Sequence, residues 1–74
     1  MRSLSITFGA AVRQLREKRG ISQEKFAATA GISRTYMSEV ERGVTVVSLL
    51  TIAKIAKALE ISMSRLLQHV EADR

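Results

Sequence analysis

Four polar side chains gather where a short helix is predicted to begin. Ser33, Arg34 and Thr35 stand in succession, and Ser38 follows Arg34 by one helical turn. Apolar residues at helical spacing on the same segment, such as Met37, are predicted to face a core. The hydroxyl and guanidinium groups are therefore expected to point outward, where they can hydrogen-bond to a polar partner.

Residue types needed for catalysis or metal binding are scarce. The chain has no cysteine, and its one histidine and one aspartate are His69 and Asp73. No serine has a candidate base beside it, and no glycine-rich loop follows a predicted strand. The sequence therefore predicts a protein that is not an enzyme and that needs no metal and no cofactor.

Positive charge is concentrated in the first part of the chain. The net charge is +5, and residues 1–42 hold eight basic and four acidic side chains, against four and three in residues 43–74. A basic half on a small domain favours a polyanion partner, of which nucleic acid is the commonest. The alternative from charge alone is a solvated basic surface without a partner.

Length and composition also limit the architecture. A chain of 74 residues is predicted to form a single domain, 1–74, with a thin core. Without disulfides or a metal, a second subunit is a plausible source of further stability. The absence of cysteine fits a reducing compartment, no apolar run reaches the about 18 residues of a membrane span, and no signal peptide is evident. The expected location is the cytoplasm.

Serine and glycine residues divide the chain into five predicted helices. Serines have the position and chemistry of N-caps, and glycines stand where helices should end. Residues 44–47 are rich in β-branched side chains and are predicted to form a loop or short extended connection. The fourth helix is expected to turn Leu49, Ile52, Ala53, Ala56 and Leu59 inward. The predicted helices are 5–19, 22–30, 33–42, 48–59 and 62–70, which together give a compact all-α bundle.

The second and third helices have the spacing of a helix-turn-helix, at about residues 23–42. Ala27 is small enough for two helices to cross closely, and Gly31 allows a sharp turn. Ile32, Met37 and Val40 are expected to reach back to the core. These residues are predicted to fix the angle of the third helix and to leave its first turn outward.

These motifs resemble the Cro and phage-repressor-like (Xre) helix-turn-helix DNA-binding family, whose fold is the lambda-repressor-like domain. The matching segments are VRQLREKRGISQEKFAATAGIS, the ERG at residues 41–43, and SLLTIAKIAKALEIS. The resemblance extends from about Phe8 to Leu67. The run SRTYMSEVERG is most similar to the small controller proteins of restriction–modification systems.

The resemblance implies that the third helix lies in the major groove of double-stranded DNA. Arg34 is then the strongest candidate for reading a base, because a guanidinium can donate two hydrogen bonds to guanine O6 and N7. Thr35, Ser38 and Ser33 are the other candidate base readers. The family pattern also implies a phosphate contact at Gln23. Further phosphate candidates, from the chemistry of their side chains, are Tyr36, Lys25, Arg19, Arg42 and Thr45. The three cations have the alternative of a solvated charge, and Thr45 lies in a loop that departs from the family pattern. Tyr36 has the alternative of packing in the core.

Two further expectations concern architecture. The family pattern implies a structural ion pair between Arg16 and Glu41. Specific sites usually need two recognition helices related by a two-fold axis, so a homodimer is expected. The fifth helix, about residues 63–70, is predicted to form the dimer interface, through Leu67 and Val70 with Leu50.

The predicted function is a sequence-specific transcription regulator that binds a palindromic or pseudopalindromic operator as a homodimer, of the restriction–modification controller type. The alternative is a DNA-binding antitoxin that also binds a toxin. Activation and repression stay open; RNA polymerase would be a further partner of an activator.

Overall fold

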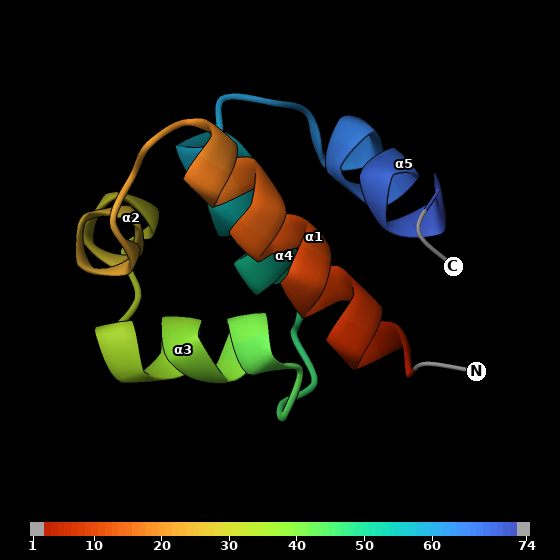
Figure 1. Cartoon of the computed structure of the whole chain (residues 1–74), viewed down its shortest axis with the longest axis horizontal. Coiled ribbons are helices and arrows are strands. Elements are labelled where there is room, and N and C mark those ends of the chain that lie inside the picture. The colour runs from red at the N-terminus through yellow and green to blue at the C-terminus, as the bar shows by residue number, and fades with distance from the viewer. Residues whose placement is uncertain (1–2, 73–74) are drawn as a thin grey trace.

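The computed structural model describes residues 3–72, and these form five helices joined by short connections (Figure 1). Residues 3–72 contain no strand, so the predicted all-α five-helix bundle is confirmed. The last helix runs two residues beyond the predicted end at Val70, while Asp73 lies outside the described residues. The helices are α1 (Leu4–Lys18), α2 (Gln23–Ala30), α3 (Arg34–Arg42), α4 (Leu49–Ala58) and α5 (Met63–Ala72).

A serine precedes each helix and accepts a hydrogen bond from a backbone N–H in the first turn. Such caps satisfy amide groups that have no partner within the helix. The caps, with the residue whose N–H each accepts, are Ser3 (Ile6), Ser22 (Lys25), Ser33 (Tyr36), Ser48 (Thr51) and Ser62 (Arg65). Gly31 and Gly43 end α2 and α3 in the left-handed region, with φ of 74° and 73°, where a side chain would be strained.

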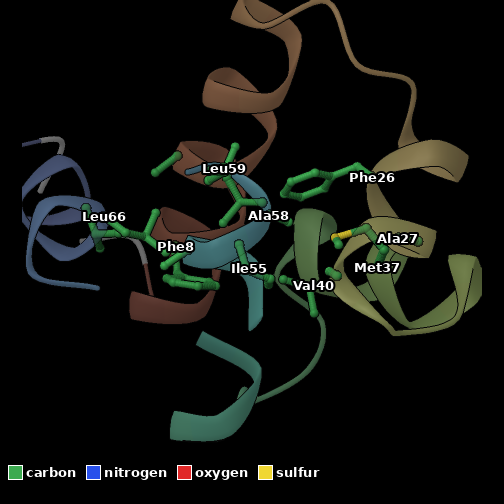
Figure 2. Close-up of a cluster of buried hydrophobic side chains, with 14 residues drawn as sticks. Phe8, Phe26, Ala27, Met37, Val40, Ile55, Ala58, Leu59 and Leu66 are labelled. Carbon is green, nitrogen blue, oxygen red and sulfur yellow. The ribbon is translucent and has the colours of Figure 1, made fainter. Parts of the chain in front are cut away.

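The five helices enclose one core. In Figure 1, α2 and α3 lie on one side of α1, and α5 lies on the other. Helix α1 packs against α3 and α5, while α4 packs against α2 and α5. Every helix contributes buried apolar side chains, many of which are shown in Figure 2. Those with less than 2% exposure include Val12, Phe26, Met37, Val40, Ile55, Leu59 and Leu66.

Two predictions about apolar side chains were wrong. Val70 was expected at a dimer interface, but it is 2% exposed and belongs to the core, one turn after the buried Leu66. Leu49 was expected to face inward, but it is 75% exposed. Helical spacing places Leu49 near the inner stripe of α4, but the rest of the described chain leaves its side chain uncovered, while Thr51 in the same turn is buried. Leu50, beside it, is also exposed.

Helices α1 and α3 approach each other at Gly9. A Cβ atom at this position would collide with the carbonyl oxygen of Val40 and lie 2.7 Å from that of Glu41. Only glycine lets the two backbones come this close. The contact brings α1 against the C-terminal half of α3.

A buried ion pair joins the same two helices. Arg16 Nε donates to Glu41 Oε2 at 2.7 Å, and Arg16 Nη2 donates to Oε1 at 3.0 Å. The two side chains are 10% and 3% exposed. Arg16 Nη1 also donates to the carbonyl of Ile21 at 2.7 Å, which ties the α1–α2 connection to the pair. The hydrogen bonds with Glu41 raise the pKa of the Arg16 guanidinium against the lowering effect of burial, so Arg16 stays charged.

The pair predicts a large effect of removing one partner. Glu41→Ala leaves the Arg16 cation buried without its carboxylate, and we expect the free energy of unfolding in urea to fall by about 3–5 kcal/mol. The matched control is Glu17→Ala, because Glu17 pairs with Arg13 on the surface, with side chains 54% and 63% exposed. That control should change stability by about 0.5 kcal/mol or less. A similarly small loss for Glu41→Ala would contradict a structural role for the buried pair.

Candidate nucleic-acid interface

The first turn of α3 is open to solvent while the opposite side of the helix is held in the core. Arg34 and Thr35 are exposed, and Ser38, one turn later, is half-buried. Met37 and Val40 are buried. The helix is therefore anchored by one face and presents three of the predicted base-reading side chains on another.

Ser33 and Tyr36 are more restricted. The Ser33 hydroxyl oxygen accepts from the backbone N–H of Tyr36 at 3.0 Å, so it caps α3. Tyr36 is half-buried against the core, and its hydroxyl lies 3.4 Å from Thr51 Oγ1. The packing alternative for Tyr36 is thus part of the structure. Contacts of either hydroxyl with DNA stay predictions.

Two adjoining hollows lie beside α3. The first, of about 330 Å³, is lined by α1, the start of α2 and α3, and the second has a volume of about 300 Å³. Gln23, Ser38 and Arg42 line both, so the structure brings a predicted phosphate contact from α2 next to the predicted base readers. The other lining residues are Arg13, Arg16 and Glu41 in the first, and Arg34 and Thr35 in the second.

Hydrogen bonds around the first hollow hold its polar groups in place. Gln23 Nε2 donates to Glu41 Oε1 at 3.1 Å, which adds Gln23 to the buried ion pair. Arg42 Nε donates to Ser38 Oγ at 3.3 Å. Every fully buried side-chain nitrogen and oxygen in the described chain has a hydrogen-bond partner. The floor of the hollow is therefore fixed, while Arg42 at its rim is exposed.

Arg13 belongs to this surface although sequence reasoning had not selected it. Its side chain is 63% exposed and pairs with Glu17 at 3.1 Å. Arg13 precedes Arg16 by three residues, so the two lie on neighbouring positions of one helix face. That spacing is a signal in the sequence that could have identified Arg13. With Arg34 and Arg42, it gives the surface three exposed arginines.

The remaining predicted phosphate contacts divide into two groups. Lys25 is exposed in the first turn of α2, and Thr45 is half-buried in the α3–α4 connection. Arg19 forms the second group: its guanidinium holds the α4–α5 connection, and a phosphate contact by Arg19 stays a prediction. Arg19 donates to the Leu59 carbonyl and to the Glu60 carboxylate, both at 2.7 Å. It lines neither of the two hollows.

Residues 3–72 contain no cluster of three or more histidine, cysteine, aspartate or glutamate side chains suited to a metal ion. No helix in this part of the chain has the length and apolar character needed to cross a membrane. The polar surface beside α3 brings together several of the predicted base-reading and phosphate-binding side chains.

Comparison with known proteins agrees with this geometry. A model of the helix-turn-helix family matches residues 12–66. The control protein C.MunI of a Mycoplasma species is 40% identical over 74 residues, which cover 99% of this chain and 100% of that protein. The crystal structure of the restriction-modification controller protein C.AhdI from Aeromonas hydrophila superposes with a TM-score of 0.80 and 44% identity, covering 82% of this chain and 92% of that one. The biofilm regulator SinR, solved in complex with DNA, superposes with a TM-score of 0.75 and 31% identity, covering 81% and 97%. The chain belongs to the helix-turn-helix family that includes the restriction–modification controller proteins.

Proposed function

We propose that this protein is a sequence-specific DNA-binding transcription regulator of the restriction–modification controller type, acting as a homodimer on a two-fold-symmetric operator. The observation that carries the proposal is the exposed first turn of α3, which presents Arg34 and Thr35 on a helix whose other face is fixed by the core. The similarity to C.MunI and C.AhdI supports the controller assignment. These relatives favour a regulator over the antitoxin alternative.

Base reading follows from the placement of α3. When its first turn enters the major groove, the Arg34 guanidinium can donate to guanine O6 and N7. The Thr35 side chain offers a hydroxyl to a base or a methyl group to thymine. Ser38 faces the same side one turn later. The buried side of α3 keeps these groups at a fixed depth in the groove.

Phosphate binding sets the depth and register of the domain on the duplex. The start of α2 has free backbone N–H groups and a positive dipole end, which suit a phosphate. Gln23 stands at this end, and its amide is held by Glu41. Arg13 and Arg42 flank the same hollow. Lys25 and Thr45 extend the contact along the backbone.

Dimer formation would cover apolar side chains that the single chain leaves exposed. Leu50 is 65% exposed and Leu67 38% exposed. Leu49 and Val46, in and beside the first turn of α4, are also exposed. On a two-fold-symmetric operator the two α3 helices would lie about 34 Å apart, one turn of DNA.

Removal of the Arg34 guanidinium tests base reading. Arg34→Ala should lose the preference for guanine at one position per half-site, with discrimination falling by about 1–3 kcal/mol. Selection of bound sites from random DNA measures this for wild type and variant. Lys57→Ala, which removes an exposed cation from α4, is the control and should select the wild-type site. Identical sites selected by Arg34→Ala would refute the assignment of Arg34 as a base reader.

Lys25→Ala tests the phosphate role of α2. Affinity should fall about equally for all DNA sequences, and the slope of log K against log salt should become shallower by about 0.9, because one counterion fewer is released. Titrations at several salt concentrations measure the slope. An unchanged slope would show that Lys25 meets no phosphate.

Leu50→Glu tests the dimer. Burial of a leucine side chain contributes about 1.5–3 kcal/mol, so the dimer dissociation constant should rise at least about tenfold. Sedimentation equilibrium at micromolar concentration measures it, with wild type expected at twice the 8.2 kDa mass of the chain. Lys57→Glu, farther along α4, should leave the association unchanged. A wild-type protein that remains monomeric both alone and on DNA would contradict the proposed assembly.

A further inference from the structure

The candidate base reader Arg34 has a side-chain partner in the structure. Arg34 Nη1 lies 3.4 Å from Glu24 Oε2, which links the first turn of α3 to the first turn of α2. Both side chains are largely exposed, at 63% and 78%. The contact therefore adds little to the fold, and its effect falls on the orientation of Arg34 and on the net charge of the surface around it.

The position of Arg34 makes a neighbouring carboxylate important. Arg34 is the first residue of α3, where unpaired N–H groups give the helix its positive end. A cation there is repelled by the dipole of its own helix. The first turn of α3 contains no acidic residue, whereas the first turn of α2 contains Glu24. The negative charge that offsets the dipole is thus supplied from the neighbouring helix.

We propose that Glu24 is a positioning residue that sets the guanine specificity of Arg34. The inference rests on the proposed DNA-binding function. An arginine side chain carries five N–H donors in one plane. The contact with Glu24 uses Nη1 and leaves the Nε and Nη2 edge of the guanidinium for the O6 and N7 of guanine. Arg34 then reaches the base edge in one orientation.

The same carboxylate weakens binding that does not depend on sequence. Glu24 stands at the helix end that is proposed to meet a phosphate, so its charge opposes non-specific affinity. It also occupies Arg34, which would otherwise be free to turn to a phosphate. Glu24 therefore lowers affinity for random DNA while raising the contrast between guanine and other bases.

A neutral isostere separates these effects. Glu24→Gln keeps the size of the side chain and removes its charge. We expect the guanine contrast at the position read by Arg34 to fall about two- to fivefold, the range of exposed ion pairs. The affinity for random-sequence DNA should rise, and the base preferences at operator positions that Arg34 does not read should stay unchanged. Selection from random DNA measures the base preference at every position. Titrations on the best site, on the same site with the guanine read by Arg34 replaced by another base, and on random-sequence DNA measure the guanine contrast and the non-specific affinity.

Two controls make the test specific. Glu60→Gln removes the same charge from another exposed ion pair, with Arg19, outside the polar surface beside α3, and should leave the base profile unchanged. The double variant Glu24→Gln/Arg34→Ala should show the same base profile as Arg34→Ala alone, because Glu24 acts through Arg34. Urea unfolding of Glu24→Gln should match that of wild type.

The outcomes separate the two proposals. If wild type selects a defined site and Glu24→Gln selects it with the same guanine contrast, or loses contrast equally at all positions, the role of Glu24 is overturned and DNA recognition stands. If wild type enriches no sequence at all, the proposed function itself fails.

Discussion

The buried pair of Arg16 and Glu41 is the interaction on which the rest of the surface depends. It joins α1 to the end of α3, while Arg16 also holds the connection to α2 and Glu41 holds Gln23. One ion pair thus fixes the relative placement of three helices. Buried pairs of this kind specify geometry more than they add stability, because desolvation offsets much of their attraction. In this protein the pair fixes the orientation of α3 relative to α1 and α2.

Packing supports the same placement from both sides. Gly9 lets the backbone of α1 reach the end of α3, and the left-handed glycines at 31 and 43 let the chain turn tightly at both ends of α3. Met37 and Val40 then anchor the helix in the core. The hydroxyl, amide and guanidinium groups on the polar surface therefore belong to helices whose positions are fixed by the core. A small domain can in this way hold polar side chains rigidly without disulfides.

Local signals in the sequence predicted most of the fold. The serine caps and helix-ending glycines act within a few residues, so the helices were found to within one or two residues. Interactions between distant segments were harder. Val70 and Leu49 each lie at helical spacing from buried residues of their own helix, yet Val70 is buried and Leu49 is exposed. The difference depends on whether another helix covers the side chain. Arg19 and Arg13 are both surface arginines by pattern, and only the tertiary arrangement separates the one that holds the α4–α5 connection from the one that faces the hollow. Gly9 gave no local signal, because its constraint comes from a backbone about thirty residues away in the chain.

The pair of Arg16 and Glu41 was predicted from the family resemblance, and the base-reading and phosphate-binding roles remain predictions.

The division of α3 into a buried face and an exposed first turn has an evolutionary consequence. Residues 34 and 35 are exposed and carry almost no packing, so substitutions there should cost little in folding. Under the proposed function, such substitutions would change the preferred DNA sequence. The residues that fix the orientation of α3, such as Gly9, Arg16 and Glu41, lie elsewhere and can stay constant. Recognition can therefore diverge rapidly among related chains while the scaffold is retained, which would allow neighbouring regulators of this architecture to coexist in one cell without acting on each other's sites.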